Sequence, residues 1–238
     1  MIELNKIYLG DSLELLKQIK DDSVDLIVTD PPYIVDTTTP SEKTSSIKSI
    51  GKLWGKNENS LVGIDNGFNI DQHLTEWKRV LKKFNAFIFC SNKQISSLMK
   101  WGEDNGFVTT CLIWWKYNAP PLCNGNWISD IEYCIHIREK GATFQGNADI
   151  KSKVYRNSIV KSEYDHPTVK PLELIKKYIL LGSNENDVIL DPFCGSGTTV
   201  NACIQLKRQY LAYKIEPKYF KIAIDRQNRA IGNVGLFS

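Results

Sequence analysis

Short apolar runs alternate with longer amphipathic segments along the chain. The short runs are rich in β-branched and aromatic residues and predict seven strands, at 7–9, 24–29, 86–90, 108–115, 131–137, 188–190 and 210–213. The helical spacing of apolar residues predicts helices over 12–19, 70–81, 171–181, 198–206 and 219–229. Because strands alternate with helices, the pattern indicates a mostly parallel α/β sheet with helical crossovers.

Two stretches interrupt this alternation. The segment at about 34–69 is polar, and the region at about 118–161 is rich in Asn and Gly around its one expected strand. Both carry a local excess of basic residues, although the formal net charge is only +3. Such stretches can form a phosphate-facing surface, and solvated loops would show the same charges. Long irregular segments in a compact domain are usually functional or mobile, and we expect the substrate to contact these two.

Composition narrows the class of protein. The 238 residues, with 42% hydrophobic and 24% charged side chains, fit one globular domain over 1–238. No run of about 18 apolar residues could span a membrane, and the first residues lack the pattern of a signal peptide. The six cysteines form no C-x-x-C pair, which favours reduced thiols in the cytoplasm over disulfides or structural zinc.

The first candidate for chemistry is Asp30-Pro31-Pro32-Tyr33, directly after an apolar strand. Ligands of open α/β sheets bind beyond the carboxyl ends of the strands. The prolines make the turn rigid and leave its carbonyls free to accept hydrogen bonds. A carboxylate and a carbonyl held in this way can accept both hydrogens of a planar exocyclic amine, and Tyr33 offers a face for stacking. A plain strand-ending turn is the alternative interpretation.

A second candidate is the turn after the strand at 188–190, which reads Asp191-Pro192-Phe193-Cys194-Gly195-Ser196-Gly197-Thr198. Its glycines let the backbone approach a ligand closely, and the following helix offers N–H groups to an anion. No Gly-Lys-Ser/Thr follows, so the turn is not a P-loop, and the third glycine of the dinucleotide fingerprint is missing.

Two weaker signals lie elsewhere in the chain. His166-Pro167-Thr168-Val169-Lys170-Pro171 places polar donors between prolines at a helix start. Gly10-Asp11-Ser12 follows the first strand, where an aspartate most often caps a helix.

Taken together, the three proline-containing motifs resemble the S-adenosylmethionine-dependent amino methyltransferases of DNA. Their order, with the catalytic motif before the cofactor loop, resembles the permuted β group, and the likeness runs from Gly10 to about Arg229. It implies a three-layer Rossmann-like methyltransferase fold with a mostly parallel seven-stranded sheet. It also implies S-adenosyl-L-methionine as cofactor, and double-stranded DNA, with no membrane, as partner. A homodimer and a cognate restriction endonuclease are compatible with it.

The resemblance implies a role for each motif. Asp30, Pro31, Pro32 and Tyr33 would hold and stack the target base, which must be flipped out of the duplex because pairing buries its amine. The cofactor would be bound by residues of the remaining motifs and by Asp30 itself, namely Asp11, Asp30, His166, Thr168, Lys170, Asp191, Phe193, Cys194, Gly195, Gly197, Thr198 and Lys214. The segment at 34–69 would contact the strand during flipping, and the region at 118–161 would recognise the target sequence.

Aspartate at the first position of the catalytic motif favours transfer to N6 of adenine in this family, and serine favours N4 of cytosine. We therefore expect a site-specific DNA adenine-N6 methyltransferase. Transfer to cytosine N4 in DNA, or to an amine in RNA, would need the same chemistry. A nucleic-acid-binding protein with a vestigial cofactor pocket is the alternative from another class.

One position departs from the family pattern. Lys214 stands where the family usually carries an acid that accepts hydrogen bonds from the cofactor's ribose, and a lysine can only donate. Glu216, two residues later, offers partial compensation. We therefore expect cofactor binding to be weaker than is usual in the family.

Overall fold

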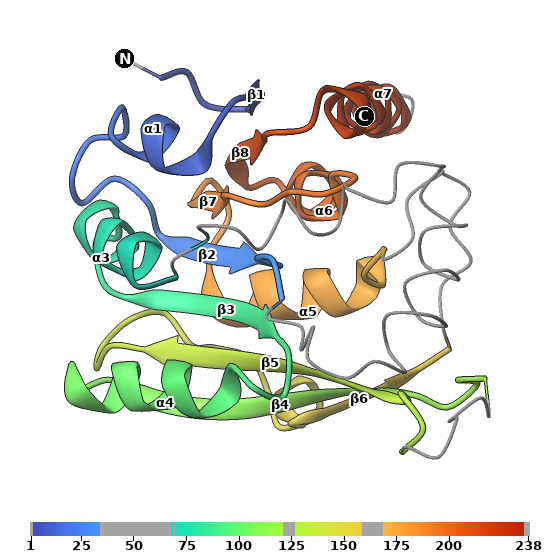
Figure 1. Cartoon of the computed structure of the whole chain (residues 1–238). Helices are drawn as coiled ribbons and strands as arrows, with labels where there is room; N and C mark the ends of the chain where they lie inside the picture. Colours follow the sequence, from blue (N-terminus) through green and yellow to red (C-terminus); the bar gives the residue numbers. More distant parts are fainter. Residues whose placement is uncertain (1, 34–67, 69, 121–126, 159–168, 236–238) are drawn as a thin grey trace, which may run out of the picture.

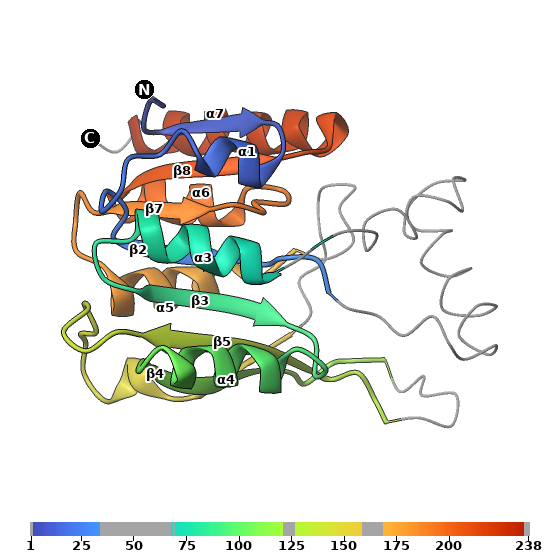
Figure 2. The same cartoon turned by 60° about the vertical axis from the view of Figure 1, so that its left-hand side comes forward.

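The computed structural model describes residues 2–33, 68, 70–120, 127–158 and 169–235, and within them the chain forms one eight-stranded sheet between two layers of helices (Figures 1 and 2). The strands are β1 (Lys6–Leu9), β2 (Leu26–Thr29), β3 (Asn85–Cys90), β4 (Val108–Lys116), β5 (Ile131–Arg138), β6 (Val154–Asn157), β7 (Val188–Asp191) and β8 (Gln209–Lys214). Their order is β1-β8-β7-β2-β3-β5-β4-β6. β5 is antiparallel to both of its neighbours, and the other described pairs are parallel.

Helices cover both faces of the sheet. On one face lie α1 (Ser12–Leu16), α3 (Ile70–Val80) and α4 (Ile95–Asp104), in front of the strands in Figure 2. On the other face lie α5 (Leu172–Gly182), α6 (Thr198–Gln205) and α7 (Pro217–Gly235). A 3₁₀ turn, η1 (Asp149–Lys151), precedes β6. The fully buried apolar side chains of β2 and β3 form the centre of both cores, because the sheet is covered on both sides.

The expected fold class is confirmed, with three corrections to the elements. The sheet contains an eighth strand, β6, inside a stretch that we expected to be irregular. The helix α4 was not predicted, and α7 extends beyond both ends of the predicted helix at 219–229. In the described part of the chain, no helix is both long and apolar enough to cross a membrane.

The order of the strands creates a switch point. β2 and β7 are adjacent and parallel, but β2 is followed along the chain by β3 on one side, and β7 by β8 on the other. In open α/β sheets such a point opens a crevice at the carboxyl ends of the strands, where ligands bind. The turn at Asp30 and the turn at Asp191 are therefore brought to the same place.

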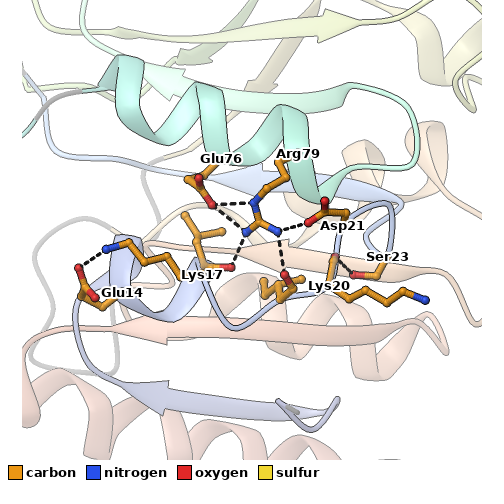
Figure 3. A network of polar contacts seen from close by, with 9 residues as sticks. Glu14, Lys17, Lys20, Asp21, Ser23, Glu76 and Arg79 are labelled. Carbon is orange, nitrogen blue, oxygen red and sulfur yellow. Dashed lines mark hydrogen bonds and ion pairs between the residues drawn. The ribbon is translucent and has the colours of Figure 1, made fainter.

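A polar network beside the sheet joins α1 to α3 (Figure 3). Arg79, in the last turn of α3, donates to the carbonyls of Leu16 and Ile19 at 2.8 and 2.9 Å. It also forms an ion pair with Glu76, at 2.7 Å. The guanidinium thus binds two carbonyls at and just after the end of α1, and the Leu16 carbonyl also accepts from the backbone N–H of Ile19. This contact holds α1, and with it the loop at Asp11, against the body of the domain.

A buried histidine makes the stability depend on pH. The His136 ring stacks on Phe87, with 3.9 Å between centroids, and its Nε2 lies 3.0 Å from Asn85 Oδ1. The amide group of Asn85 donates to two backbone carbonyls, so its oxygen is the acceptor and His136 Nε2 carries the proton. Burial, and then the charge of Arg138, lower the pKa of His136 to about 3. The ring is therefore neutral in the folded protein near pH 7.

We expect the free energy of unfolding to fall as the pH drops from about 6.5 towards 3 because of His136. In that window the unfolded chain binds a proton that the native ring excludes, with a loss of up to about 5 kcal/mol. His136→Gln should remove this contribution. The measurement is urea unfolding of both proteins at pH 7.5, 6 and 5. Asp191, whose pKa is raised, titrates in both proteins, so only the difference between them is informative. Identical pH profiles would contradict the assignment.

Candidate active site

The turns after β2 and β7 are joined by a hydrogen bond at the switch point. Thr29 Oγ1 donates to Asp191 Oδ1 at 2.8 Å, and the backbone N–H of Phe193 donates to the same oxygen at 3.2 Å. Burial raises the pKa of Asp191 to about 6, and these hydrogen bonds limit the rise. Asp191 therefore fixes the position of one turn relative to the other.

The Asp-Pro-Pro-Tyr turn is supported from α4. Gln94, which is buried, donates from Nε2 to the Pro32 carbonyl at 3.4 Å. Its Oε1 accepts from the backbone N–H of Ser91 at 3.0 Å. Pro31 is buried, while Asp30 and Tyr33 are partly exposed. Sequence reasoning missed Gln94, because nothing in the local pattern links it to a turn about 60 residues upstream.

The Asp30 carboxylate belongs to a buried chain of alternating charges. Lys170 Nζ lies 2.6 Å from Asp30 Oδ2 and 3.1 Å from Glu132 Oε2, and Lys116 Nζ lies 3.3 Å from Glu132 Oε1. Only 7% of the Lys170 side chain is exposed. Burial alone would lower the pKa of Lys170, but the charges of the two carboxylates outweigh it and raise the pKa, so the ammonium stays protonated.

The second oxygen of Asp30, Oδ1, does not share the ion pair that Oδ2 forms with Lys170. Asp30 Oδ1 and the Tyr33 hydroxyl are buried, and neither has a hydrogen-bond partner among the described residues. Burial, followed by the charges of Asp30 and Glu132, raises the pKa of Tyr33 well above its usual value, so the phenol is neutral. Buried polar atoms without partners are uncommon in folded proteins. Here the turn holds an acceptor oxygen next to an aromatic ring, which suits a flat ligand carrying an N–H group.

The turn after β7 has the backbone geometry of a ligand-binding loop. Gly195 and Gly197 have φ of 51° and 82°, in the left-handed region that favours glycine. Gly197 occupies the N-cap position of α6 and supplies no capping side chain. The N–H groups of the first turn of α6 therefore remain for an anionic ligand such as an amino-acid carboxylate.

The C-terminal helix holds this loop in place. Arg226 of α7 is buried and donates from Nη1 to the Ser196 carbonyl at 2.7 Å, and it lies 3.4 Å from Thr198 Oγ1. A Cβ on Gly197 would lie 3.4 Å from Ala223 Cβ. Sequence reasoning missed Arg226, because an arginine in an amphipathic helix gives no sign that it is buried against a distant loop.

Three loops predicted to bind the cofactor lie side by side. The Gly10 N–H donates to the Lys214 carbonyl at 3.0 Å, and the Cys194 N–H donates to the Tyr213 carbonyl at 3.1 Å. The ends of β1, β8 and β7 therefore converge. Asp11 Oδ1 caps α1, accepting from the N–H groups of Leu13 and Glu14. The capping role proposed as the simple interpretation is thus present, and contact with the cofactor stays a prediction.

Aromatic side chains line up next to these loops. The Phe193 ring lies 5.0 Å from His73 and 5.5 Å from Phe68, measured between centroids. His73 Nε2 lies 2.7 Å from Ser12 Oγ, next to Asp11. His73 is buried, and nothing in the sequence indicates that it lies beside Phe193.

The remaining predicted residues fall into three groups. Cys194 is buried and burial raises the pKa of its thiol, which fits packing rather than reactivity. Lys170, predicted to lie near the cofactor, instead contacts Asp30, and any contact with the cofactor stays a prediction. His166 and Thr168 lie outside the described residues. The described residues contain no cluster of acids, histidines and cysteines that could hold a metal ion.

Comparison with known proteins identifies the family of the chain. A family model described as DNA methylase matches residues 24–225, and the chain therefore belongs to the N6/N4 DNA methylase family. It is 29% identical to the Type II methyltransferase M2.MboI of Moraxella bovis, over 91% of this chain and 85% of that protein. It is 27% identical to the DNA adenine methyltransferase YhdJ of Escherichia coli K12, over 94% and 83% of the two chains. A crystal structure of the M1.HpyAVI–SAM complex superposes with a TM-score of 0.65 at 29% identity, covering 93% of this chain and 98% of that one.

Lys214 provides a direct test of the cofactor site. Its Nζ lies 5.1 Å from the ring centroid of Tyr219, and burial lowers its pKa. Lys214→Glu should tighten binding of S-adenosylmethionine roughly tenfold, because a carboxylate can accept from ribose hydroxyls where an ammonium cannot. Isothermal calorimetry measures this directly.

Lys218→Glu is the matched control, since Lys218 contacts the same Tyr219 ring but lies beyond the strand end. It should leave the affinity unchanged. Equal or weaker binding by Lys214→Glu would contradict the expectation.

Proposed function

We propose that this protein is a site-specific DNA methyltransferase that methylates the exocyclic N6 amine of an adenine flipped out of double-stranded DNA. The methyl donor is S-adenosyl-L-methionine. The observation that carries the proposal is that the two oxygens of the Asp30 carboxylate have different surroundings. Its Oδ2 is held by Lys170, and its Oδ1 is buried without a partner at the end of a proline-braced turn.

Residues of the converging loops fit the cofactor. The glycine turn and the uncapped start of α6 suit the carboxylate of its methionine half, with Phe193, Gly195, Gly197 and Thr198 around it. Asp11 and Lys214 lie on the two neighbouring strand ends, where its adenosine half would be held. When bound, the cofactor supplies a methyl group on a sulfonium, a leaving group that keeps the electron pair of the broken bond.

The catalytic turn acts on the amine. The lone pair of an exocyclic amino nitrogen is delocalised into the base, so the nitrogen is a poor nucleophile. In this proposal Asp30 Oδ1 accepts one N–H and the Pro31 carbonyl accepts the other, which lets the nitrogen become tetrahedral and direct its lone pair at the methyl carbon. The nitrogen loses one proton after transfer, and Asp30 Oδ1 is the adjacent acceptor. Placement and charge stabilisation supply the rate, and Tyr33 stacks on the extruded base.

Exposed groups beside the site support DNA as the substrate. The Arg156 guanidinium lies over the rings of Trp115 and Tyr117, at 4.7 and 5.4 Å from their centroids, where β4 and β6 end. Trp127 is 97% exposed. Cationic and aromatic groups of this kind contact phosphates and bases. They fall in or next to the region at 118–161, which we propose for target recognition; the segment at 34–69 lies almost wholly outside the described residues.

Adenine is favoured over cytosine by Asp30 at the head of the motif and by the likeness to a protein named a DNA adenine methyltransferase. The test is to express the chain in a strain without DNA methylation and sequence its genome for modified bases. N6-methyladenine in a fixed context is expected. N4-methylcytosine, modification of RNA alone, or binding of DNA without any methyl transfer would overturn the proposal. A homodimer, a companion endonuclease and a cytoplasmic location stay predictions.

A further inference from the structure

Glu132 is the only acidic residue of the largely apolar strand β5, and it belongs to the buried charge chain. The register of the sheet sets it opposite Trp114 of β4, which belongs to the core beneath α5. Only 21% of its side chain is exposed. Burial alone would raise the pKa of Glu132, but the charges of Lys170 and Lys116 outweigh it and lower the pKa, so the carboxylate is ionised.

Lys170 is shared between two carboxylates. Its ammonium lies between Asp30 Oδ2 and Glu132 Oε2, and it also lies 5.0 Å from the Phe89 ring centroid and 5.5 Å from that of Tyr33. An ammonium buried beside a single carboxylate would be drawn to both of that carboxylate's oxygens, because each is an acceptor and little water competes. A second carboxylate, that of Glu132 with Oε2 at 3.1 Å, competes for the ammonium.

This arrangement leaves one oxygen of Asp30 unused. Asp30 Oδ1 is buried without a partner among the described residues, even though an ammonium with three donors contacts the neighbouring oxygen. Lys116 in turn balances Glu132, so the four charges sum to zero and the group can remain buried.

We propose that Glu132 is a positioning residue for methyl transfer, which holds Lys170 on Oδ2 of Asp30 and so keeps Oδ1 available for the amine of the target base. The inference rests on the proposed function. It assigns to Glu132 no contact with the base or the cofactor. Glu132 acts only through Lys170, and its removal should affect the chemical step rather than binding.

The experiment compares Glu132→Gln with Glu139→Gln. Glutamine at 132 keeps the size and an acceptor oxygen but removes the charge that competes for Lys170. Glu139 lies just beyond the other end of β5, where its Oε2 accepts from the backbone N–H of Phe84 at 3.0 Å, so it controls for loss of a carboxylate from the same region of the sheet. Single-turnover and steady-state rates are measured on a duplex that the wild type methylates.

For Glu132→Gln we expect kcat to fall roughly 10- to 100-fold, the scale of a small misplacement of a catalytic group. The KM for DNA and the Kd for S-adenosylmethionine should change less than twofold. Glu139→Gln should retain the wild-type kcat. In the Lys170→Gln background, Glu132→Gln should cause no further loss of activity, because the lysine through which Glu132 acts has already been removed.

A kcat for Glu132→Gln within twofold of wild type overturns the inference, as does a raised KM at unchanged kcat. So does a full additional loss in the Lys170→Gln background. If Glu132→Gln does not fold, Glu132→Asp is judged by the same criteria. Its side chain is shorter by one methylene, which moves the carboxylate away from Lys170. If the wild type itself transfers no methyl group to any duplex, the proposed function has failed, which is a separate result.

Discussion

Asp30→Ala is expected to slow methyl transfer by roughly 10²–10³-fold, the usual loss when one group that stabilises the transition state is removed. In the proposed mechanism the Asp30 carboxylate contributes its charge next to the amine, and alanine would leave that N–H without an acceptor. Binding of S-adenosylmethionine should weaken less than the rate, because the glycine turn, Phe193 and the first turn of α6 are untouched. Transfer of a labelled methyl group to duplex DNA measures the rate, and calorimetry measures the affinity.

Asp104→Ala is the matched control for this substitution. Asp104 forms an exposed ion pair with Lys100 at the end of α4, so its loss should leave the rate unchanged. Thermal unfolding of both variants shows whether the fold is retained. A folded Asp30→Ala protein with a rate within threefold of wild type would refute the role of Asp30 in catalysis, and with it the proposed chemistry.

Lys170→Met should lower the free energy of unfolding at pH 7.5 by at most roughly 3–5 kcal/mol, because it removes the cation shared by two largely buried carboxylates, of which only Glu132 keeps another partner, Lys116. The pKa of Lys170 is raised and that of Glu132 is lowered in the folded protein, so the wild type keeps this contribution from neutral pH up to the ordinary lysine value and loses it in acid, where the carboxylates protonate. In the variant the deficit should shrink as the pH falls towards 5, since protonation removes the charge of an unpaired carboxylate. Urea unfolding at pH 7.5 and 5.5 measures both effects.

Lys100→Met tests whether any lost ion pair has this effect. Lys100 is fully exposed and pairs with Asp104, so no measurable change in stability is expected. If Lys170→Met were as stable as wild type at pH 7.5, the two carboxylates would not depend on its charge, and our account of the buried chain would be wrong.

Much of the fold was predictable from hydrophobic periodicity. Buried strands such as β2 and β3 are continuous apolar runs, and this signal is strong when both faces of a sheet are covered. β6 was not predicted because its four residues lie at the edge of the sheet and half of them are exposed. α4 was not predicted because serines and a glycine interrupt its apolar stripe. The helix is stabilised by packing against β4 and β5 rather than by its own helix propensity.

In the candidate site, too, some residues were predictable from the sequence and others were not. Asp30 and Asp191 were identifiable because each follows an apolar strand, and the sheet order then brings them together. Glu132, Gln94 and Arg226 were not, because their partners Lys170, Pro32 and Ser196 lie 30 to 62 residues away along the chain, and the segments around the three residues look ordinary. Lys170 was assigned to a plausible neighbourhood, but its partner could not be known before the chain between it and Asp30 was folded.

The pairing of β1 with β8 bears on how the protein is made. Within the described sheet, β1 has β8 as its sole neighbour, with Lys6 opposite Leu211. A ribosome must therefore synthesise nearly all of the chain before β1 can pair with β8. Contacts between residues so far apart in the sequence form slowly. A nascent or prematurely terminated polypeptide would hold Asp11 away from the glycine turn, so this pairing makes an intact carboxyl-terminal region a condition for any methylating activity.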